Sequence, residues 1–196
     1  VEHLNLHIRG GELIALVGEN GAGKSTLIKL LLRFYDPTSG AIRVGGADLR
    51  ELDPEGWRGR IGVLFQDYAN YELSVRENVQ MGRPGAIADD SKVLTALEDA
   101  RSDWLLKKMP RGLHANVGRL FEGGHDLSGG EWQRLALARI MYRDADVWIL
   151  DEPTASLDPE AEAAIFAELK EMLRGRIVIV ISHGFSWVRI GDRIAV

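Results

Sequence analysis

The sequence contains no cysteine among its 196 residues, which excludes disulfide bonds and thiolate metal sites. Stability must therefore come from packing. Apolar runs are short, and the longest strongly apolar one, residues 177–181, is far below the roughly 18 residues that a membrane-spanning helix needs. The first residues also lack the basic, apolar and small-residue succession of a secretion signal. We expect a cytosolic domain that does not itself cross a bilayer.

The sequence also has no excess of positive charge, with 24 Lys and Arg residues against 29 Asp and Glu residues. The formal net charge is -5 and the isoelectric point is near 5.6, which argues against broad nucleic-acid binding, since phosphate affinity depends on a dense positive surface. Lys107, Lys108 and Arg111 are interpreted as a solvated face. An apolar content of 45% with 27% charged residues is typical of one soluble globular domain.

Hydrophobic patterning predicts an α/β core. Leu4, Leu6 and Ile8 alternate with polar residues, which predicts a half-buried strand ending at the glycine pair that follows. Residues 13–17 form a continuous apolar run, as in a strand covered on both faces. A helix is expected after it, and helices also separate the later strands, so the sheet should be mainly parallel. The helix is expected at 24–32, and the further strands at 42–44, 61–65, 147–150, 177–181 and from 193 onward.

The middle of the chain has a different residue pattern, which predicts helices rather than strands. Candidate helices at 75–81, 91–100 and 103–109 are not separated by any long β-branched run. We therefore assign residues 67–130 to an inserted helical subdomain, and residues 1–66 and 131–196 to the core. No internal repeat or low-complexity linker divides the chain further.

A glycine-rich segment lies where the first buried strand meets its helix, and it fits the pattern of a phosphate-binding P-loop. Its glycines let successive backbone N–H groups face a phosphate, and the helix N-terminus adds partial positive charge. The lysine should reach the β- and γ-phosphates of a nucleotide, and the serine hydroxyl after it should bind Mg²⁺. The alternative is a glycine turn with a surface lysine. The segment is Gly18, Glu19, Asn20, Gly21, Ala22, Gly23, Lys24, Ser25 and Thr26.

Two adjacent carboxylates end a later apolar strand, in the segment VWILDEP. Open α/β sheets place ligand chemistry at such carboxyl ends. Asp151 should hold Mg²⁺, directly or through water, and Glu152 should polarise the water that attacks the γ-phosphate. If no nucleotide bound, both would be solvated loop acids.

The segment LSGGE has two interpretations. Ser128 and Glu131 have the spacing of a capping box, so a helix start alone would explain them. It would not explain Gly129 and Gly130, which cost backbone entropy unless something approaches the backbone closely. Exposed N–H groups, a serine hydroxyl and a helix dipole would together form a second anion site.

With these three motifs in this order, the sequence resembles the nucleotide-binding domain of ABC transporters along essentially its whole length. The resemblance implies a P-loop NTPase core with a mainly parallel sheet, a small antiparallel β lobe and an inserted α-helical subdomain. It also implies hydrolysis of ATP with Mg²⁺ in a head-to-tail dimer, where Ser128, Gly129 and Gly130 of one domain cover the ATP on the P-loop of the other. The further partner would be a transmembrane domain, which would place this domain on the cytoplasmic face of a membrane.

Three further site residues follow from the resemblance alone. Gln66, after the strand at 61–65, matches a glutamine that contacts Mg²⁺ or water, although a polar residue at a strand end is common. His183 matches a histidine that contacts the γ-phosphate, whereas the other histidines are interpreted as surface or packing residues. Asp158 matches an aspartate at the dimer seam, and it would also serve as the N-cap of a helix at 159–174.

The sequence departs from the family pattern in two places. Glu131 stands where the family usually has glutamine, and its carboxylate would repel a triphosphate unless it turns back into the capping box, which is the pose we expect. The aromatic residue that stacks on adenine lies in this family about 25 residues before the lysine, and Lys24 leaves no room for it. The chain also stops at Val196, inside the strand expected from residue 193 onward, so we expect a domain trimmed at both ends.

The subfamily follows from the segments 74–82 and 118–126, which resemble exporter domains. In that family the second segment, with Glu122 and Gly124, meets the coupling helices of the membrane domain, although Glu122 could equally be an ordinary loop acid. Two other functions stay open: a soluble ABC ATPase of DNA repair or translation, and a clamp that binds ATP without hydrolysing it. The small helical insertion and the acidic charge disfavour the first, and the presence of Glu152 and His183 disfavours the second.

Overall fold

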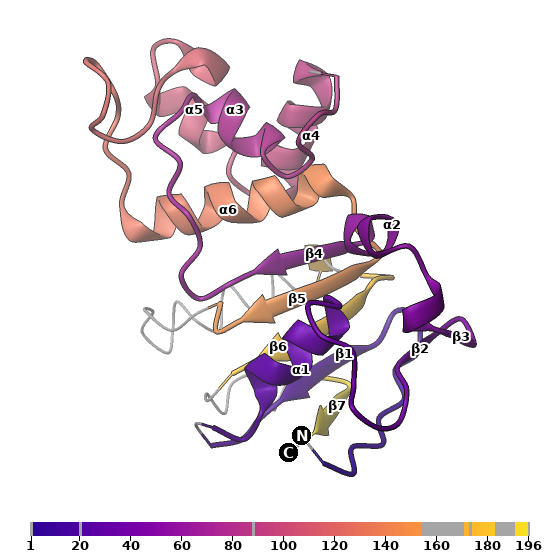
Figure 1. Ribbon diagram of the computed structural model, residues 1–196. Coiled ribbons are helices and arrows are strands. Elements are labelled where there is room, and N and C mark those ends of the chain that lie inside the picture. The colour runs from indigo at the N-terminus through magenta and orange to yellow at the C-terminus, as the bar shows by residue number, and fades with distance from the viewer. Residues whose placement is uncertain are drawn as a thin grey trace. The chain divides into compact units, whose positions relative to one another are not determined.

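The structure is a computed structural model that describes residues 2–19, 21–87, 89–153, 171–172, 174–182 and 191–195. Its described strands include a five-stranded sheet in the order β4-β5-β6-β1-β7. Every neighbouring pair in this sheet is parallel, and the arrowheads of its central strands point the same way in Figure 1. The expected α/β fold with a parallel sheet is confirmed. The strands are β1 (Leu13–Leu16), β4 (Ile61–Leu64), β5 (Val147–Asp151), β6 (Ile177–Ile181) and β7 (Arg193–Ala195).

The helix α1 (Lys24–Leu31) lies across one face of this sheet (Figure 1). Its Ile28, together with Leu32 just after it, joins a buried cluster with isoleucines of the central strands, including Ile14 and Ile179. Each fully buried side chain of this size stabilises the fold by about 1.5–3 kcal/mol. The apolar face of α1 therefore holds the helix against the sheet, and with it the P-loop that precedes it.

The C-terminus of α1 is capped by side chains of the helix α2 (Pro54–Gly59). Trp57 donates from Nε1 to the Leu31 carbonyl at 2.6 Å, and the Arg58 guanidinium donates to two more carbonyls, those of Leu32 and Arg33, at 2.9 and 2.8 Å. The last carbonyls of a helix have no partner within it, and a cation at that end also interacts favourably with the helix dipole. The far end of α1 is thus held without using any group near the P-loop.

A second, two-stranded sheet pairs β2 (Arg43–Val44) with β3 (Ala47–Asp48) in antiparallel fashion, and the 3-10 helix η1 (Leu49–Glu51) follows it. This is the small antiparallel lobe that the family resemblance implies. Asp48 accepts from the Arg50 guanidinium at 2.7 and 3.0 Å. These bonds, together with one from the Arg50 N–H, lower the pKa of Asp48 to about 2.

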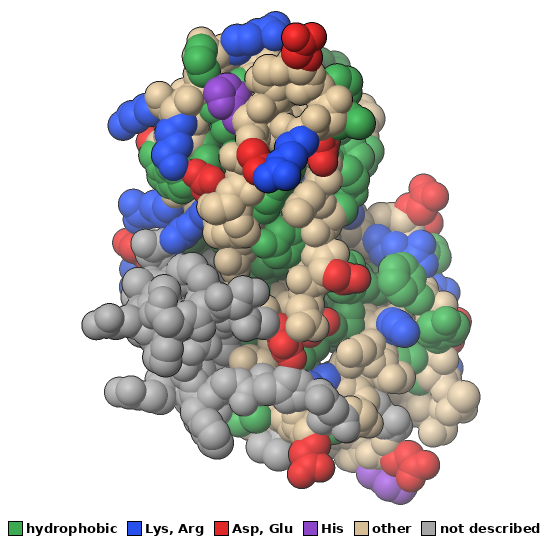
Figure 2. Space-filling model, turned by 90° about the vertical axis from the view of Figure 1, so that its left-hand side faces the viewer, with side chains coloured by type: hydrophobic (Ala, Val, Ile, Leu, Met, Phe, Trp, Pro, Cys, Tyr) green, Lys and Arg blue, Asp and Glu red, His purple; other side chains and the backbone are tan. Residues whose placement is uncertain are grey.

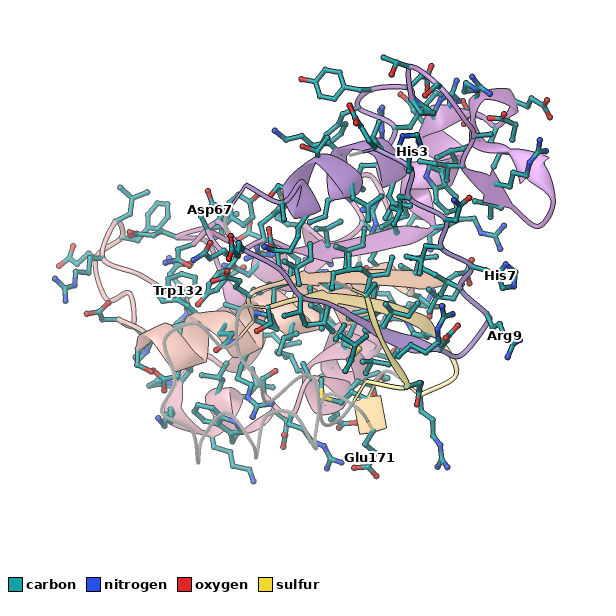
Figure 3. All side chains as sticks on the ribbon, turned by 90° about the horizontal axis from the view of Figure 1, so that it is seen from below. His3, His7, Arg9, Asp67, Trp132 and Glu171 are labelled. Carbon is teal, nitrogen blue, oxygen red and sulfur yellow. The ribbon has the colours of Figure 1, made fainter. Side chains whose placement is uncertain are left out.

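The strand expected around Leu4, Leu6 and Ile8 is absent, because the described backbone from residue 4 to residue 9 is irregular. Leu6 and Ile8 do pack against the buried cluster, whereas Leu4 is exposed, so the alternation indicated half-burial correctly at two of its three positions. Side chains, rather than a neighbouring strand, bind this backbone: the His7 carbonyl accepts from Arg193 at 2.6 Å. His7 itself points outward (Figure 3). Alternation shows which side chains are buried, but a strand also needs a partner edge.

The helices of the middle segment form a second unit. These are α3 (Val75–Gln80), α4 (Asp90–Asp99), α5 (Trp104–Lys108), the 3-10 helix η2 (Gly112–His114) and α6 (Gly129–Arg143). Both α3 and α4 pack against α6, which buries one face of each. Basic and acidic side chains are interspersed on the face of this unit seen in Figure 2. The expected helices lie within one or two residues of the observed ones.

The chain divides into the unit Val1–Gln66 with Ala145–Val196 and the unit Asp67–Asp144. The first division coincides with the boundary that we expected after Gln66. The second differs, because we expected the core to resume at residue 131, whereas α6 groups with the helical unit. The physical reason is that α6 buries its apolar residues, among them Leu135 and Ala138, in contact with α3 and α4.

A buried polar network joins three parts of the helical unit. Asn78 is fully buried on α3, and its amide donates to the Tyr71 carbonyl at 2.7 Å while its Oδ1 accepts from Arg139 at 3.1 Å. The Arg139 guanidinium also stacks on the Tyr71 ring at 4.5 Å from the centroid. Buried polar groups with good partners specify one arrangement, because leaving any member unpaired is costly.

The closest backbone approach of this unit is at Gly82, just after α3. A Cβ atom built there would lie 1.8 Å from the Arg139 carbonyl oxygen of α6, and 2.9 Å from the carbon of the same group. Both atoms belong to the backbone of a helix, so they have little freedom to move. Only glycine allows α3 and α6 to meet in this way.

We therefore predict that Gly82→Ala destabilises the helical unit by about 1–3 kcal/mol or more, the range for inserting atoms into a packed site. Gly59→Ala is the matched control, because nothing lies within 4 Å of a Cβ atom built at Gly59. Urea denaturation followed by circular dichroism measures both variants. Parent-like unfolding of Gly82→Ala would mean that the two helices separate without cost.

Candidate functional site

The P-loop connects β1 to α1, as the sequence predicted. Gly21 and Gly23 have φ values of +87° and +95°, in the left-handed region that favours glycine. Gly23 is the N-cap of α1 and has no side chain with which to cap it. The first N–H groups of a helix have no partner within the helix, so an uncapped α1 presents donors and positive dipole potential to an anion.

Lys24 folds back over the loop. Its ammonium donates to the carbonyl oxygens of Gly18 at 2.6 Å and Glu19 at 2.9 Å. These bonds hold the charge beside the helix N-terminus, where a phosphate would lie. The side chains of Ser25 and Thr26 are exposed in the first turn of α1, so their hydroxyls are accessible from the same side.

The strand register brings the acidic motif to the same edge of the sheet. Ile181 of β6 pairs on one side with Leu16, the last residue of β1, and on the other with Asp151, the last residue of β5. Neighbouring strands lie about 4.8 Å apart, so the backbones that enter the P-loop and carry Asp151 are roughly 10 Å apart. Side chains of this length, with an ion and a phosphate between them, span such a distance.

Glu152 has an unusual backbone conformation. Its φ is +47°, in the left-handed region, which costs a non-glycine residue about 1–2 kcal/mol. Its N–H donates to the Ile181 carbonyl at 2.8 Å, so the end of β6 holds it there. Strain of this kind is often found at functional sites, where it aims a side chain. Sequence reasoning identified Glu152 but not this conformation.

Gln66 lies at the same edge, two residues after β4, and is exposed. β4 pairs with β5 through Leu64 and Leu150. The first unit therefore places Gln66, Asp151, Glu152 and the P-loop at the edge where the parallel strands end. Asn20, Asp158 and His183 lie outside the described residues. Ser182, the residue before His183, donates its N–H to the Leu16 carbonyl at 3.3 Å.

The LSGGE motif belongs to the helical unit, where it begins α6. Ser128 Oγ accepts from the Glu131 N–H at 3.4 Å, and Glu131 Oε2 accepts from the Ser128 N–H at 2.8 Å. This is the capping box, and it confirms that Glu131 turns back rather than pointing forward. Gly129 and Gly130 are exposed, and no atom lies within 4 Å of a Cβ atom built on either.

Sequence reasoning missed the role of Lys108. Its ammonium donates to Glu131 Oε1 at 2.7 Å and lies 4.7 Å from the centroid of the Trp104 ring. The hydrogen bond from Lys108, and then that from the Ser128 N–H, lower the pKa of the Glu131 carboxyl. Lys108 is largely exposed, as expected, but it is not merely a solvated charge. Its partner is 23 residues away, beyond any local pattern.

The residues at the sheet edge suit Mg²⁺. Ser25, Gln66 and Asp151 offer hydroxyl, amide and carboxylate oxygens, the ligands that Mg²⁺ prefers, and this ion commonly takes only one or two carboxylates together with substrate phosphates. In the described part of the chain, no group of three or more His, Cys, Asp and Glu residues could hold a metal alone. The donor set therefore fits an ion that arrives with a nucleotide.

A P-loop on an uncapped helix, with a paired acidic motif at the same edge of a parallel sheet, defines a P-loop nucleotide-binding core. The chain belongs to the ABC transporter family, because the family model described as "ABC transporter" matches residues 1–155. It is an ATP-binding domain of that family, and such domains are ATPases coupled to transport.

Curated relatives include a transport ATP-binding protein and a flippase. The chain is 39% identical over 196 residues to the nisin transport ATP-binding protein NisT of Lactococcus lactis subsp. lactis, and 40% identical over 197 residues to an ATP-dependent lipid A-core flippase of Ralstonia nicotianae. Each alignment covers all of this chain and 33% of the relative. The chain thus spans about a third of the length of the curated relatives it matches. None of the described helices is long and apolar enough to traverse a membrane.

Solved structures agree. A bacterial Atm1-family ABC exporter with ATP bound matches with a TM-score of 0.81 and 34% identity, covering 95% of this chain and 32% of that one. The ABC ATPase fold expected from the sequence is therefore confirmed, and it matches about a third of that exporter.

We predict that Lys24→Met weakens binding of MgATP by about 10- to 150-fold, since one hydrogen bond to a charged group is worth about 1.5–3 kcal/mol. Lys29→Met is the matched control, because Lys29 is exposed in the last turn of the same helix. Calorimetric titration measures both affinities. Equal binding by the parent and Lys24→Met would exclude Lys24 from phosphate binding.

Proposed function

We propose that this chain hydrolyses MgATP as the motor domain of an exporter-type membrane transporter. The observation that carries the proposal is the shared sheet edge: the P-loop, Asp151, Glu152 and Gln66 all belong to the first unit and lie where its parallel strands end. Binding alone would need only the P-loop. Hydrolysis also needs a proton acceptor for the attacking water, and the second carboxylate at the same edge, Glu152, can supply it.

Each residue has a role in this proposal. The P-loop N–H groups and Lys24 bind the β- and γ-phosphates and leave the γ-phosphate at the edge of the sheet. Glu152 accepts a proton from the attacking water, and its left-handed backbone aims the carboxylate. His183 contacts the γ-phosphate, and Gln66 orients water or the ion. Asn20 completes the P-loop.

Ser25, Gln66 and Asp151 would hold Mg²⁺, with Asp151 acting directly or through water. The ion would supply neutralisation of the negative charge on the phosphates and on the leaving group. The three residues come from α1 and from the ends of two neighbouring strands, so the sheet sets their spacing.

Two copies of the domain act head to tail. Ser128, Gly129 and Gly130 of one domain cover the ATP on the P-loop of the other, and Asp158 lies at the seam between them. Support for this arrangement comes from the start of α6, where the two glycines are exposed and leave their backbone open to a close approach. The helix dipole of α6 adds favourable potential for a phosphate there.

The remaining partner is a transmembrane domain, with this chain on the cytoplasmic face of the membrane. The names of the relatives support this, since they describe transport ATP-binding proteins and a flippase. Hydrolysis would then power export, with the cargo chosen by the membrane domain.

We predict that Glu152→Gln lowers ATP hydrolysis by about 100- to 10,000-fold, the usual contribution of a general base, while MgATP binding is retained. The amide keeps the shape of the side chain but loses the proton acceptor. A phosphate-release assay and calorimetric titration measure the two properties. Glu55→Gln, an exposed acid in the first turn of α2, should keep parent activity. Parent-like turnover by Glu152→Gln would remove Glu152 from this role.

We also predict that Gly129→Asp abolishes hydrolysis without changing the affinity of a single domain for ATP. The new side chain has room within its own chain, and an acid in the first turn favours a helix, so folding is retained. Its charge would repel the partner's phosphates. Gly129→Ala is the uncharged control and should retain much more activity. If Gly129→Asp instead lost ATP binding as a monomer, the motif would act within its own chain.

A further inference from the structure

The start of α6 carries one acidic side chain, and the two oxygens of its carboxylate have separate partners. Glu131 Oε2 accepts from the Ser128 N–H at 2.8 Å, and Oε1 accepts from Lys108 Nζ at 2.7 Å. The Glu131 side chain is only 15% exposed, whereas that of Lys108 is 63% exposed. The capping box therefore orients the carboxylate, and Lys108 is the cation that balances its charge.

This cation is held in place by the packing of its helix. Leu105 and Met109, on either side of Lys108 in the chain, are buried, and Trp104 Nε1 donates to the Arg101 carbonyl at 2.9 Å. The Trp104 ring then lies beneath the Lys108 ammonium, which favours a cation at that point. Lys108 thus reaches Glu131 from a short helix that is far from the motif in sequence.

An uncompensated carboxylate here would oppose anion binding. Donor groups in the first turn of α6 attract a phosphate, but the negative charge of Glu131 in the same turn repels it. Near a protein surface such an interaction changes an affinity by roughly tenfold or more. Glutamate in the first turn stabilises the helix through the dipole. Glu131 therefore stabilises the helix but weakens phosphate binding, whereas a neutral residue would not weaken it.

We infer that Lys108 is a positioning residue for the second phosphate site: it neutralises Glu131 and locks it in the capping box, so that the start of α6 accepts the phosphates of a nucleotide. The inference rests on the proposed function, in which these phosphates belong to ATP bound by the partner domain. Lys108 itself touches no nucleotide. It acts by removing a repulsion that is equally strong before and during hydrolysis.

The test is a double-mutant cycle on ATP hydrolysis by the intact protein. Lys108→Met should raise the KM for MgATP about tenfold while kcat stays within about twofold, because losing binding equally in the ground and transition states changes KM alone. In the Glu131→Gln background the same Lys108→Met substitution should change KM less than twofold, since no charge is left to neutralise. Lys108→Arg, which keeps the charge, should restore most of the parent KM.

Lys107→Met is the matched control, because Lys107 is exposed on the same helix and pairs with no carboxylate among the described residues. Its KM should equal that of the parent. An equal rise in KM for Lys108→Met in both backgrounds would overturn the inference, because it would show that Lys108 acts through packing.

The inference and the proposed function fail in different ways. If the parent protein does not hydrolyse MgATP, or if Gly129→Asp hydrolyses it normally, the proposed function is wrong. If both behave as proposed and Lys108→Met keeps the parent KM, only the role of Lys108 is wrong.

Discussion

Parallel pairing of β5, β6 and β1 is the constraint on which the nucleotide site depends. Ile181 pairs with Leu16 on one side and Asp151 on the other, so the residues after β1 and β5 emerge at one edge with β6 between them. Because these strands are buried on both faces, slipping the register would cost burial as well as hydrogen bonds. The strand register therefore sets the separation between the P-loop and the acidic pair.

The two ends of α1 differ in whether side chains satisfy their free backbone groups. At its C-terminus, Trp57 and Arg58 satisfy three carbonyl groups, which stabilises the helix. At its N-terminus the cap is Gly23, which has no side chain to accept from the unpaired N–H groups of the first turn. Stability is gained where no ligand binds, and donors are left available where a phosphate would. The same division explains why Lys24 bonds to loop carbonyls, since it keeps its charge at the open end.

The start of α6 differs from that of α1, because it is capped although it too is proposed to bind a phosphate. Here a capping box stabilises the helix, but its glutamate brings a negative charge, which Lys108 balances from α5. An anion site can thus be combined with a well-capped helix if the charge of the cap is compensated. The compensation depends on the position of a second helix, α5, which is held by buried residues such as Leu105.

Local sequence patterns were sufficient for much of this protein. Glycine-rich loops, buried strands and capping boxes depend on neighbouring residues, so the P-loop, the strands of the main sheet and the turned-back pose of Glu131 followed from the sequence. The residues that carry the proposed chemistry could be named in the same way. Their order along the chain was also enough for the family resemblance.

Only the tertiary structure decided features that depend on distant partners. The backbone around Leu6 is half-buried without being a strand, because it pairs with none of the described strands. Helix α6 groups with the helical unit because its apolar face contacts α3 and α4. The left-handed Glu152 requires the end of β6, and the ion pair of Glu131 requires Lys108 of another helix. Sequence alone determines what a residue and its neighbours can do, whereas packing determines which distant group it meets.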